Sequence, residues 1–263
     1  MARSTIANGL RILRAEGLDG FVDALRARRS GGNRGEWTPY LQWLAFAVPG
    51  GLARGNVWCM DYAIQRLPTE HPIIEIGSSC GLSANAMTYM KERYGVGNAL
   101  YTCDPWTFDG GPEVGEMLGD SQTVQSGAYR DFMKESYVRN TRFFSANDLP
   151  HTVECTSDAF FESWRAGATC TDVFGRSAEL GGPAAFCYID GNHTYEVAKR
   201  DFENCDEVLV DGGFLLFDDS GDDTDWGSRD VAREVARSGR YELIAKNPNY
   251  FFRKKAQSSG VRG

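Results

Sequence analysis

From Pro72 onward, short apolar runs alternate with stretches of helical periodicity. The apolar run IIEI (residues 73–76) is followed by a glycine turn, by the helix-like LSANAMTYMKERYG and by a second apolar run, LYTCD. Such alternation is typical of β-α-β units, whose parallel strands are buried on both faces. The sequence therefore predicts a parallel sheet with helices on both sides.

The same alternation continues to the end of the chain. We expect strands at HTVEC, AFCYID and GGFLLFDD, and helices at GAYRDFMKESYVRNTRF, DAFFESWRAG, YEVAKRDFENCDEVL and WGSRDVAREVARSG. The glycine-rich run TCTDVFGRSAELGGP is expected to be a surface excursion without an element of its own. The runs YELIAKN and YFFRKK, joined by the turn signal NPN, favour an antiparallel hairpin at the sheet edge. The predicted fold class is α/β, with a doubly wound, seven-stranded, mostly parallel sheet.

The N-terminal part of the chain has a different pattern. Its helical periodicity comes in pieces, with Ile6, Leu10 and Leu13 on one stripe, and is interrupted by the glycine-rich SGGNRGEW. We expect a helical extension or cap over residues 1–66 and a single α/β domain over residues 67–263. Amphipathic stripes of this kind can cover a site, bind a ligand or bury a subunit interface, and we expect a homo-oligomer.

Composition excludes several classes of protein. The 263 residues carry a formal net charge of −8, and the basic residues are scattered, which argues against nucleic-acid binding. No run reaches the ~18 apolar residues of a membrane span, and the N-terminus lacks the apolar core of a signal peptide. Seven cysteines without a CxxC pair suggest buried thiols rather than disulfides or a zinc site. The expected location is the cytoplasm, with no membrane association.

The turn after the first strand has the residues of a ligand-binding loop. In IIEIGSSCGLSA, Glu75 lies at the strand end and glycines occupy positions 77 and 81. Glycines there let the backbone turn sharply and let a nucleotide-like ligand lie on it. Dinucleotide binding would favour GxGxxG, but the position of its second glycine is Ser79. The sequence therefore argues against an NAD-linked oxidoreductase.

The pattern E-x-G-x-x-x-G resembles motif I of class I S-adenosylmethionine-dependent methyltransferases, and the resemblance covers roughly residues 70–255. It implies a Rossmann-like domain that binds S-adenosylmethionine. In that family the glycine loop passes the amino-acid part of the cofactor, and the acid that ends the second strand binds the ribose hydroxyls. The corresponding cofactor-binding residues here are Glu75, Gly77, Ser78, Gly81 and Asp104.

Two alternatives remain open for these residues. The acids could merely end strands, and the glycines could merely turn the chain. After the third predicted strand, Ser157 stands where such folds contact adenine, but it could equally be the N-cap of the following helix.

Two later strands also end in acids. Asp190 follows one in YIDGNHTY, and Asp218 and Asp219 follow another in LFDDS. Because ligands bind beyond the carboxyl ends of parallel strands, these side chains should converge on one crevice, with Asp190 also bordering the cofactor. Three close carboxylates repel unless a cation lies between them. The sequence therefore predicts a metal site for Mg²⁺, or Mn²⁺, formed by Asp190, Asp218 and Asp219.

The motif pair IDGxHxY and GGFLLFDD resembles the metal-dependent O-methyltransferases related to macrocin O-methyltransferase. That family modifies sugar hydroxyls on antibiotics and includes the rhamnose O-methyltransferase of calicheamicin biosynthesis. The resemblance implies that Asp190 and the adjacent acids ligate the metal. The family's proposed base is the second aspartate of a D-G-D triplet, but the triplet here is Asp190-Gly191-Asn192.

An amide cannot accept the proton, so the neighbouring His193, with an ordinary pKa of about 6.5, is our candidate catalytic base beside Asp190. Its alternative role is to cap the next helix. We expect Asp222, Asp223 and Asp225 to lie in a solvated loop, although one of them could replace Asp219 as a metal ligand.

The predicted function is S-adenosylmethionine- and metal-dependent methylation of a sugar hydroxyl, on a nucleotide sugar or a glycosylated natural product of antibiotic biosynthesis. One alternative is a phenol or catechol O-methyltransferase, which would often use a lysine base, and IDGNHTY contains no lysine. Another is a cofactor-binding module without turnover, against which the intact acid cluster counts.

Overall fold

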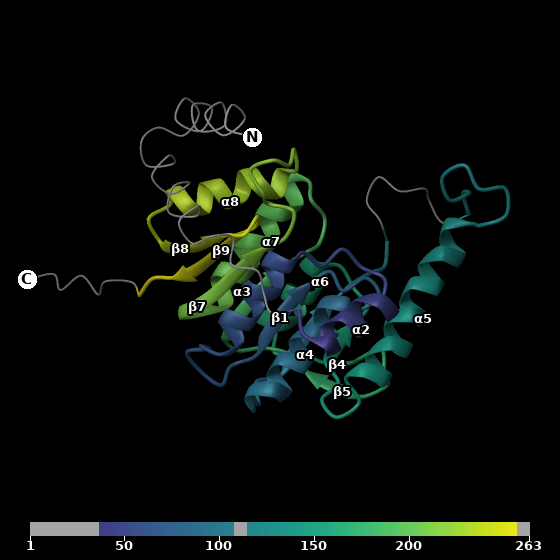
Figure 1. The fold of residues 1–263 in the computed structure, drawn as a ribbon, viewed down its shortest axis with the longest axis horizontal. Helices are drawn as coiled ribbons and strands as arrows, with labels where there is room; N and C mark the ends of the chain where they lie inside the picture. Colours follow the sequence, from purple (N-terminus) through teal and green to yellow (C-terminus); the bar gives the residue numbers. More distant parts are fainter. Residues whose placement is uncertain (1–36, 108–114, 257–263) are drawn as a thin grey trace, which may run out of the picture.

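A computed structural model of the protein describes residues 37–107 and 115–256, and its centre is a seven-stranded sheet (Figure 1). The strand order is β3-β2-β1-β6-β7-β9-β8. Only β9 runs against its two neighbours, β7 and β8. The predicted seven-stranded, mostly parallel sheet with an antiparallel hairpin at one edge is therefore confirmed. The strands are β1 (Ile73–Ile76), β2 (Leu100–Cys103), β3 (His151–Val153), β6 (Ala184–Ile189), β7 (Leu209–Phe217), β8 (Tyr241–Lys246) and β9 (Tyr250–Lys254).

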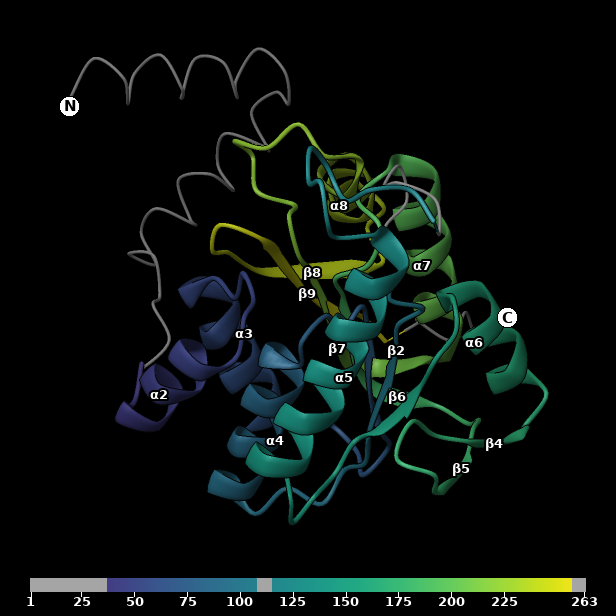
Figure 2. The ribbon, with the colours of Figure 1, turned by 90° about the vertical axis from the view of Figure 1, so that its right-hand side faces the viewer.

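Helices cover both faces of this sheet (Figure 2). Successive strand residues point to opposite faces, so Ile73 joins one hydrophobic core and Ile74 the other. The first core is closed by α2, α3, α4 and α5, and the second by α6, α7 and α8. The sheet is therefore doubly wound, as predicted. The helices are α2 (Pro39–Ala47), α3 (Arg54–Ile64), α4 (Leu82–Tyr94), α5 (Ser126–Phe144), α6 (Ser157–Arg165), α7 (Tyr195–Val208) and α8 (Gly227–Arg237).

The glycine-rich segment between α6 and β6 differs from the prediction. It contains two short antiparallel strands, β4 (Thr169–Thr171) and β5 (Ser177–Glu179), which form a separate sheet. Their turn is organised by Asp172, whose Oδ1 accepts hydrogen bonds from the backbone N–H groups of Phe174 and Arg176. The expectation of no element was wrong because three-residue strands are too short to leave a periodic pattern.

The predicted N-terminal extension is described only in part, since residues 1–36 and their stripe of Ile6, Leu10 and Leu13 lie outside the described residues. The part that is described forms α2 and α3. Val57 and Met60 of α3 are buried in the first core together with residues of the sheet. This part therefore packs as a layer of the α/β domain, and the boundary at residue 66 remains a prediction.

The cysteines agree with the prediction of buried thiols. All seven cysteines are free, and five of them are buried. Within residues 37–107 and 115–256, no helix has the length and apolar character needed to cross a membrane.

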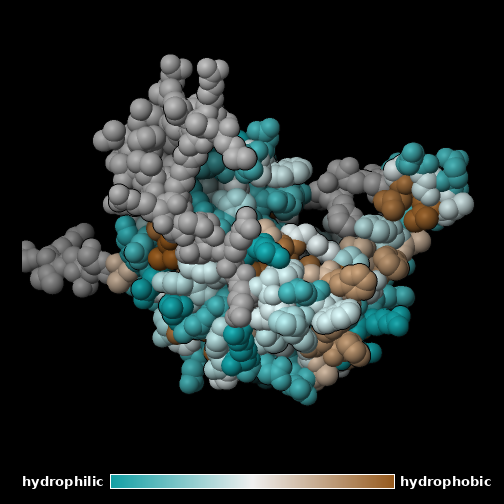
Figure 3. Space-filling view, viewed as in Figure 1, coloured by the Kyte–Doolittle hydropathy of each residue, from teal (hydrophilic) through white to brown (hydrophobic). Residues whose placement is uncertain are grey.

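The surface carries apolar side chains on and beside α5. Figure 3 shows hydrophobic colour on the right-hand side of the molecule, over α5 and the segment that precedes it. Phe132 and Phe143 of α5 are exposed, as are Met117 and Val124. Exposed apolar groups of this kind favour association with another surface. They are compatible with the predicted homo-oligomer, which remains a prediction.

Candidate active site

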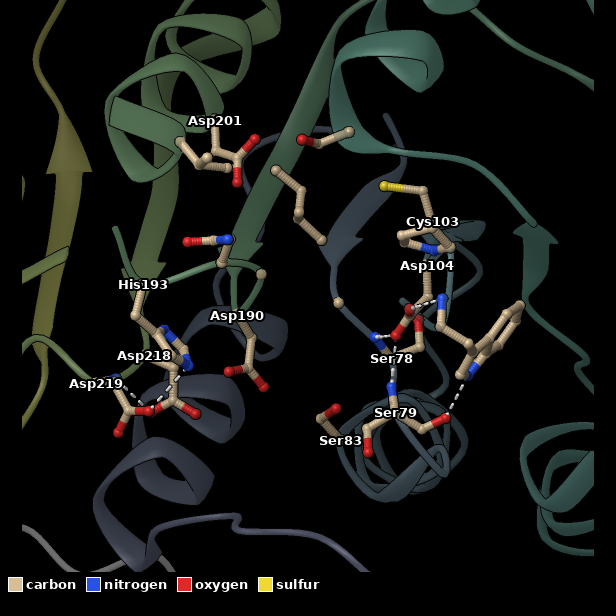
Figure 4. A pocket seen from close by; sticks show the side chains of 18 of the residues that line it. Ser78, Ser79, Ser83, Cys103, Asp104, Asp190, His193, Asp201, Asp218 and Asp219 are labelled. Carbon is tan, nitrogen blue, oxygen red and sulfur yellow. Dashed lines mark hydrogen bonds and ion pairs between the residues drawn. The ribbon is translucent and has the colours of Figure 1, made fainter. Parts of the chain in front are cut away.

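A pocket of about 560 Å³ opens at the carboxyl ends of the central strands (Figure 4). It lies where β1 and β6 are neighbours, the point at which the strand order reverses. Eight of the predicted site residues line it, and two, Glu75 and Gly81, do not. Those on the wall are Gly77, Ser78, Asp104, Ser157, Asp190, His193, Asp218 and Asp219.

The glycine loop forms one wall of the pocket. Gly77 has φ +84°, and a Cβ placed on it would lie 2.0 Å from the carbonyl oxygen of Asp190. Only glycine fits there, because β1 and the loop after β6 approach so closely. Gly81, with φ +90°, faces Tyr137 and Thr141 instead of the pocket. Gly81 therefore shapes the start of α4 and does not line the pocket.

Glu75 lies behind this loop. It is fully buried, and its Oε1 accepts a 2.5 Å hydrogen bond from the Ser83 hydroxyl of α4. Burial raises the pKa of Glu75 to about 8. The structure therefore places Glu75 as a support for the loop, and direct contact with the cofactor remains only a prediction.

This raised pKa predicts a pH dependence of stability. The folded state binds the Glu75 proton more tightly than the unfolded state, so its contribution is present below pH 4.5 and is lost as the pH rises to about 8. One pKa unit corresponds to about 1.4 kcal/mol. The free energy of unfolding of the wild type should therefore fall between pH 5 and pH 8. In Glu75→Gln, measured by denaturant unfolding, that fall should be smaller by about 2 kcal/mol or more. Glu242→Gln, at an exposed position, is the matched control. An equal fall in the free energy of unfolding in all three proteins would contradict the raised pKa of Glu75.

Asp104 holds the loop through both carboxylate oxygens. Its Oδ2 accepts hydrogen bonds from the N–H groups of Ser78 at 2.7 Å and Ser79 at 2.8 Å, and its Oδ1 accepts one from Trp106 at 2.6 Å. Burial raises the pKa of Asp104, and these three bonds oppose the rise. A carboxylate has about four lone-pair sites, so at least one remains for a ribose hydroxyl, and the predicted ribose contact remains a prediction.

The hydroxyl of Tyr188 lies within hydrogen-bond distance of both Asp190 and Asp218. The Tyr188 hydroxyl lies 2.8 Å from Oδ2 of Asp218 and 3.1 Å from Oδ2 of Asp190. Burial, followed by the negative charge of Asp218, raises the pKa of Asp190 well above its ordinary value. Asp190 therefore keeps its proton to a higher pH than an exposed aspartate.

Asp218 is surrounded by donors. Besides Tyr188, its Oδ1 accepts hydrogen bonds from Asn56 Nδ2 at 2.7 Å, from Asn249 Nδ2 and from the Asp219 N–H at 2.9 Å. These bonds occupy its lone pairs. In the described ranges, no three His, Cys, Asp or Glu side chains stand close enough to hold a metal ion. The donors around Asp218 would compete with a metal ion for its lone pairs, and the predicted metal site remains a prediction.

His193 and Asp219 form a pair on the opposite wall from the glycine loop (Figure 4). The distance between His193 Nε2 and Asp219 Oδ2 is 3.2 Å, and the imidazole is 28% exposed. Its ring lies 5.3 Å from the ring of Trp226. A carboxylate on one ring nitrogen fixes the orientation of the imidazole and leaves the other nitrogen for proton transfer.

The backbone around this pair is fixed by two helices. Oδ1 of Asn192 accepts a hydrogen bond from the Thr194 N–H at 2.7 Å, just before α7 begins. The carbonyl of His193 accepts one from the Ser228 N–H of α8. The Asn192 amide therefore has a structural role at the start of α7.

The structure differs from two expectations, the N-cap role of Ser157 and the solvated position of Asp222. Thr156, not Ser157, is the N-cap of α6, since its hydroxyl accepts a hydrogen bond from the Ala159 N–H. Ser157 lines the pocket instead. Asp222 does not lie free in solvent, because it pairs with Lys246 and Arg233.

Asp201 and Trp226 are among the residues of the pocket wall that the sequence analysis did not assign. Asp201 had a readable signal: it is an acid on the otherwise apolar face formed by Ala198, Phe202 and Cys205 of α7. Trp226 precedes α8 in a polar loop and had no such signal.

A family model described as a methyltransferase domain matches residues 74–220, which include the glycine loop, Asp104, Asp190 and Asp218. The chain belongs to this methyltransferase family. No curated protein matches the sequence significantly. The prediction of a methyltransferase is thus confirmed at the level of the family.

Solved structures share the fold of this methyltransferase. An O-methyltransferase from Bacillus cereus, in complex with SAH, is 15% identical, with 82% of this chain and 88% of that chain covered and a TM-score of 0.50. The O-methyltransferase TomG from Streptomyces achromogenes, involved in tomaymycin synthesis and in complex with SAM, is 13% identical, with coverages of 89% and 96% and a TM-score of 0.50. A calicheamicin methyltransferase is 19% identical, with coverages of 75% and 78% and a TM-score of 0.49. The likeness to the first two establishes the Rossmann-like methyltransferase fold.

Proposed function

We propose that this methyltransferase transfers the methyl group of S-adenosylmethionine to a hydroxyl group of a small molecule. The observation that carries the proposal is that one pocket joins the glycine loop and Asp104 on one wall to the His193–Asp219 pair on the other. The first wall has the backbone turn and ribose acceptor that a nucleoside ligand needs. The second has the base that a hydroxyl nucleophile needs.

The chemistry follows from this arrangement. A hydroxyl oxygen is a poor nucleophile at neutral pH until its proton is removed. In the proposed step, His193 takes that proton as the oxygen bonds to the methyl carbon, and the carbon–sulfur bond breaks with its electron pair passing to sulfur. Asp219 stabilises the imidazolium that forms. The products are a methyl ether and S-adenosylhomocysteine.

We also propose that the acceptor is a sugar hydroxyl. Trp226, 51% exposed beside His193, offers a flat apolar face at the pocket wall. Asn192, Thr194 and Asp219 supply polar groups around the same base. A sugar ring has both an apolar face and several hydroxyls, and this mixed wall suits it better than a wall of apolar groups alone.

Methyl transfer to a panel of acceptors tests this. With labelled S-adenosylmethionine, we expect product from nucleotide sugars or glycosides and none from catechol. Product from catechol alone would replace the sugar proposal with the phenolic alternative. No product from any hydroxyl compound, despite cofactor binding, would favour a binding module without turnover.

The metal dependence that the sequence analysis predicts remains a prediction. Asp190, Asp218 and Asp219 line one pocket, and burial, followed by the charge of Asp218, raises the pKa of Asp190 and of Asp219. A divalent cation would relieve that repulsion but would have to displace donors from Asp218. On this prediction, EDTA stops turnover and Mg²⁺ restores it. The control is a known metal-dependent enzyme that the same chelator treatment inactivates. Undiminished turnover of this protein in the chelator would then remove the metal from the proposal.

A further inference from the structure

Asp201 is a buried acid that the proposed reaction does not use. It lies on α7, is 1% exposed and lines the pocket. In the described chain, neither of its carboxylate oxygens has a partner within hydrogen-bond geometry. A buried carboxyl without a partner is destabilising, so it is expected where a ligand supplies the missing donor.

Its position defines one end of the pocket. A Cβ placed on Gly191 would lie 3.2 Å from Oδ2 of Asp201, so the carboxyl lies against the loop that follows β6. Ser157, from the loop after β3, lines the same pocket. Burial raises the pKa of Asp201 to about 7, and the nearby Ser157 hydroxyl opposes part of this rise although it does not reach hydrogen-bond geometry with either carboxylate oxygen. Figure 4 shows Asp201 set apart from Asp190, Asp218 and Asp219.

The proposed function assigns the other parts of the pocket. The methyl group must lie near His193, the amino-acid part along the glycine loop and the ribose near Asp104. The purine is the part of S-adenosylmethionine that remains for the end lined by Asp201 and Ser157. Adenine carries an exocyclic amino group with two N–H donors, and a carboxylate only accepts hydrogen bonds.

We propose that Asp201 accepts a hydrogen bond from the 6-amino group of the cofactor's adenine, and that it thereby selects adenine over a 6-oxo purine. This inference rests on the proposed function. A 6-oxo purine presents an oxygen in place of the amino group, and two facing acceptors repel and leave the buried carboxyl unpaired.

Calorimetry with two ligands and two proteins tests the inference, at a pH well above the Asp201 pKa of about 7 so that the side chain is a carboxylate. The ligands are S-adenosylhomocysteine and S-inosylhomocysteine, which differ at position 6 of the purine. We expect the wild type to bind the adenine compound at least ~10-fold more tightly. Asp201→Asn keeps the shape of the side chain but adds an N–H donor, so it should bind the inosine compound more tightly and reduce the preference to about threefold or less.

The control is Asp158→Asn, on the neighbouring helix α6. Asp158 pairs with Arg200 and does not line the pocket, so this variant should keep the wild-type preference. If both compounds bind and Asp201→Asn has the same preference as the wild type, Asp201 does not read the purine, and the proposed function stands. If the wild type binds neither compound, the proposed cofactor and this inference are both wrong.

Discussion

Gly77→Ala should weaken the binding of S-adenosylmethionine at least ~100-fold in calorimetry. The new Cβ would lie 2.0 Å from the Asp190 carbonyl oxygen, a backbone atom that cannot give way without moving the loop after β6. Because that loop carries His193 and the glycine loop carries the N–H groups bound by Asp104, both walls of the pocket would shift.

A matched control separates crowding from backbone strain. Gly95, at the end of α4, also has positive φ, +65°, but a Cβ there would meet nothing within 4 Å. Gly95→Ala therefore carries the strain without the collision, and it should bind the cofactor like the wild type. Thermal unfolding of both variants shows whether either has lost its fold. Normal cofactor binding by a folded Gly77→Ala variant would mean that the loop does not shape the cofactor site.

His193→Ala should lower kcat by ~10²–10⁴-fold and leave the Kd for the cofactor nearly unchanged. The imidazole is the base of the proposed reaction, and it lies on the wall opposite the glycine loop. Asp219→Asn should cause a smaller loss, since it removes the charge that stabilises the imidazolium but leaves the base in place.

The control for this prediction is His71→Ala. His71 precedes β1, at the amino end of the sheet, and does not line the pocket. Its turnover should match the wild type. Full turnover by His193→Ala would make the histidine a structural residue, and Asp190 would then be the next base to test.

The fold was predictable from local pattern, with limits that have a physical cause. Buried parallel strands such as IIEI and AFCYID are continuous apolar runs, and amphipathic helices repeat every 3.6 residues, so each leaves a signal within its own segment. The strands β4 and β5 left none, because they are three residues long and their turn depends on the side chain of Asp172.

The site was predictable as a set of strand ends rather than as a set of contacts. Parallel strands place their carboxyl ends at one edge, so the acids after β2, β6 and β7 could be assigned to one pocket in advance. The hydrogen-bond partners of these acids could not be assigned in advance. Asn56, which bonds to Asp218, lies 162 positions away. Two of the three donors to Asp104 come from the glycine loop after β1.

The sequence by itself determined the doubly wound sheet, the glycine turn at Gly77 and the convergence of Asp104, Asp190 and Asp218 on one crevice, since each depends on short-range pattern or on the geometry common to all parallel sheets. Only the tertiary structure decided that Glu75 supports the loop from behind, that Asp219 pairs with His193 and that Asp201 is left without a partner. Burial and hydrogen bonding depend on which distant segments pack together, and no local pattern encodes that.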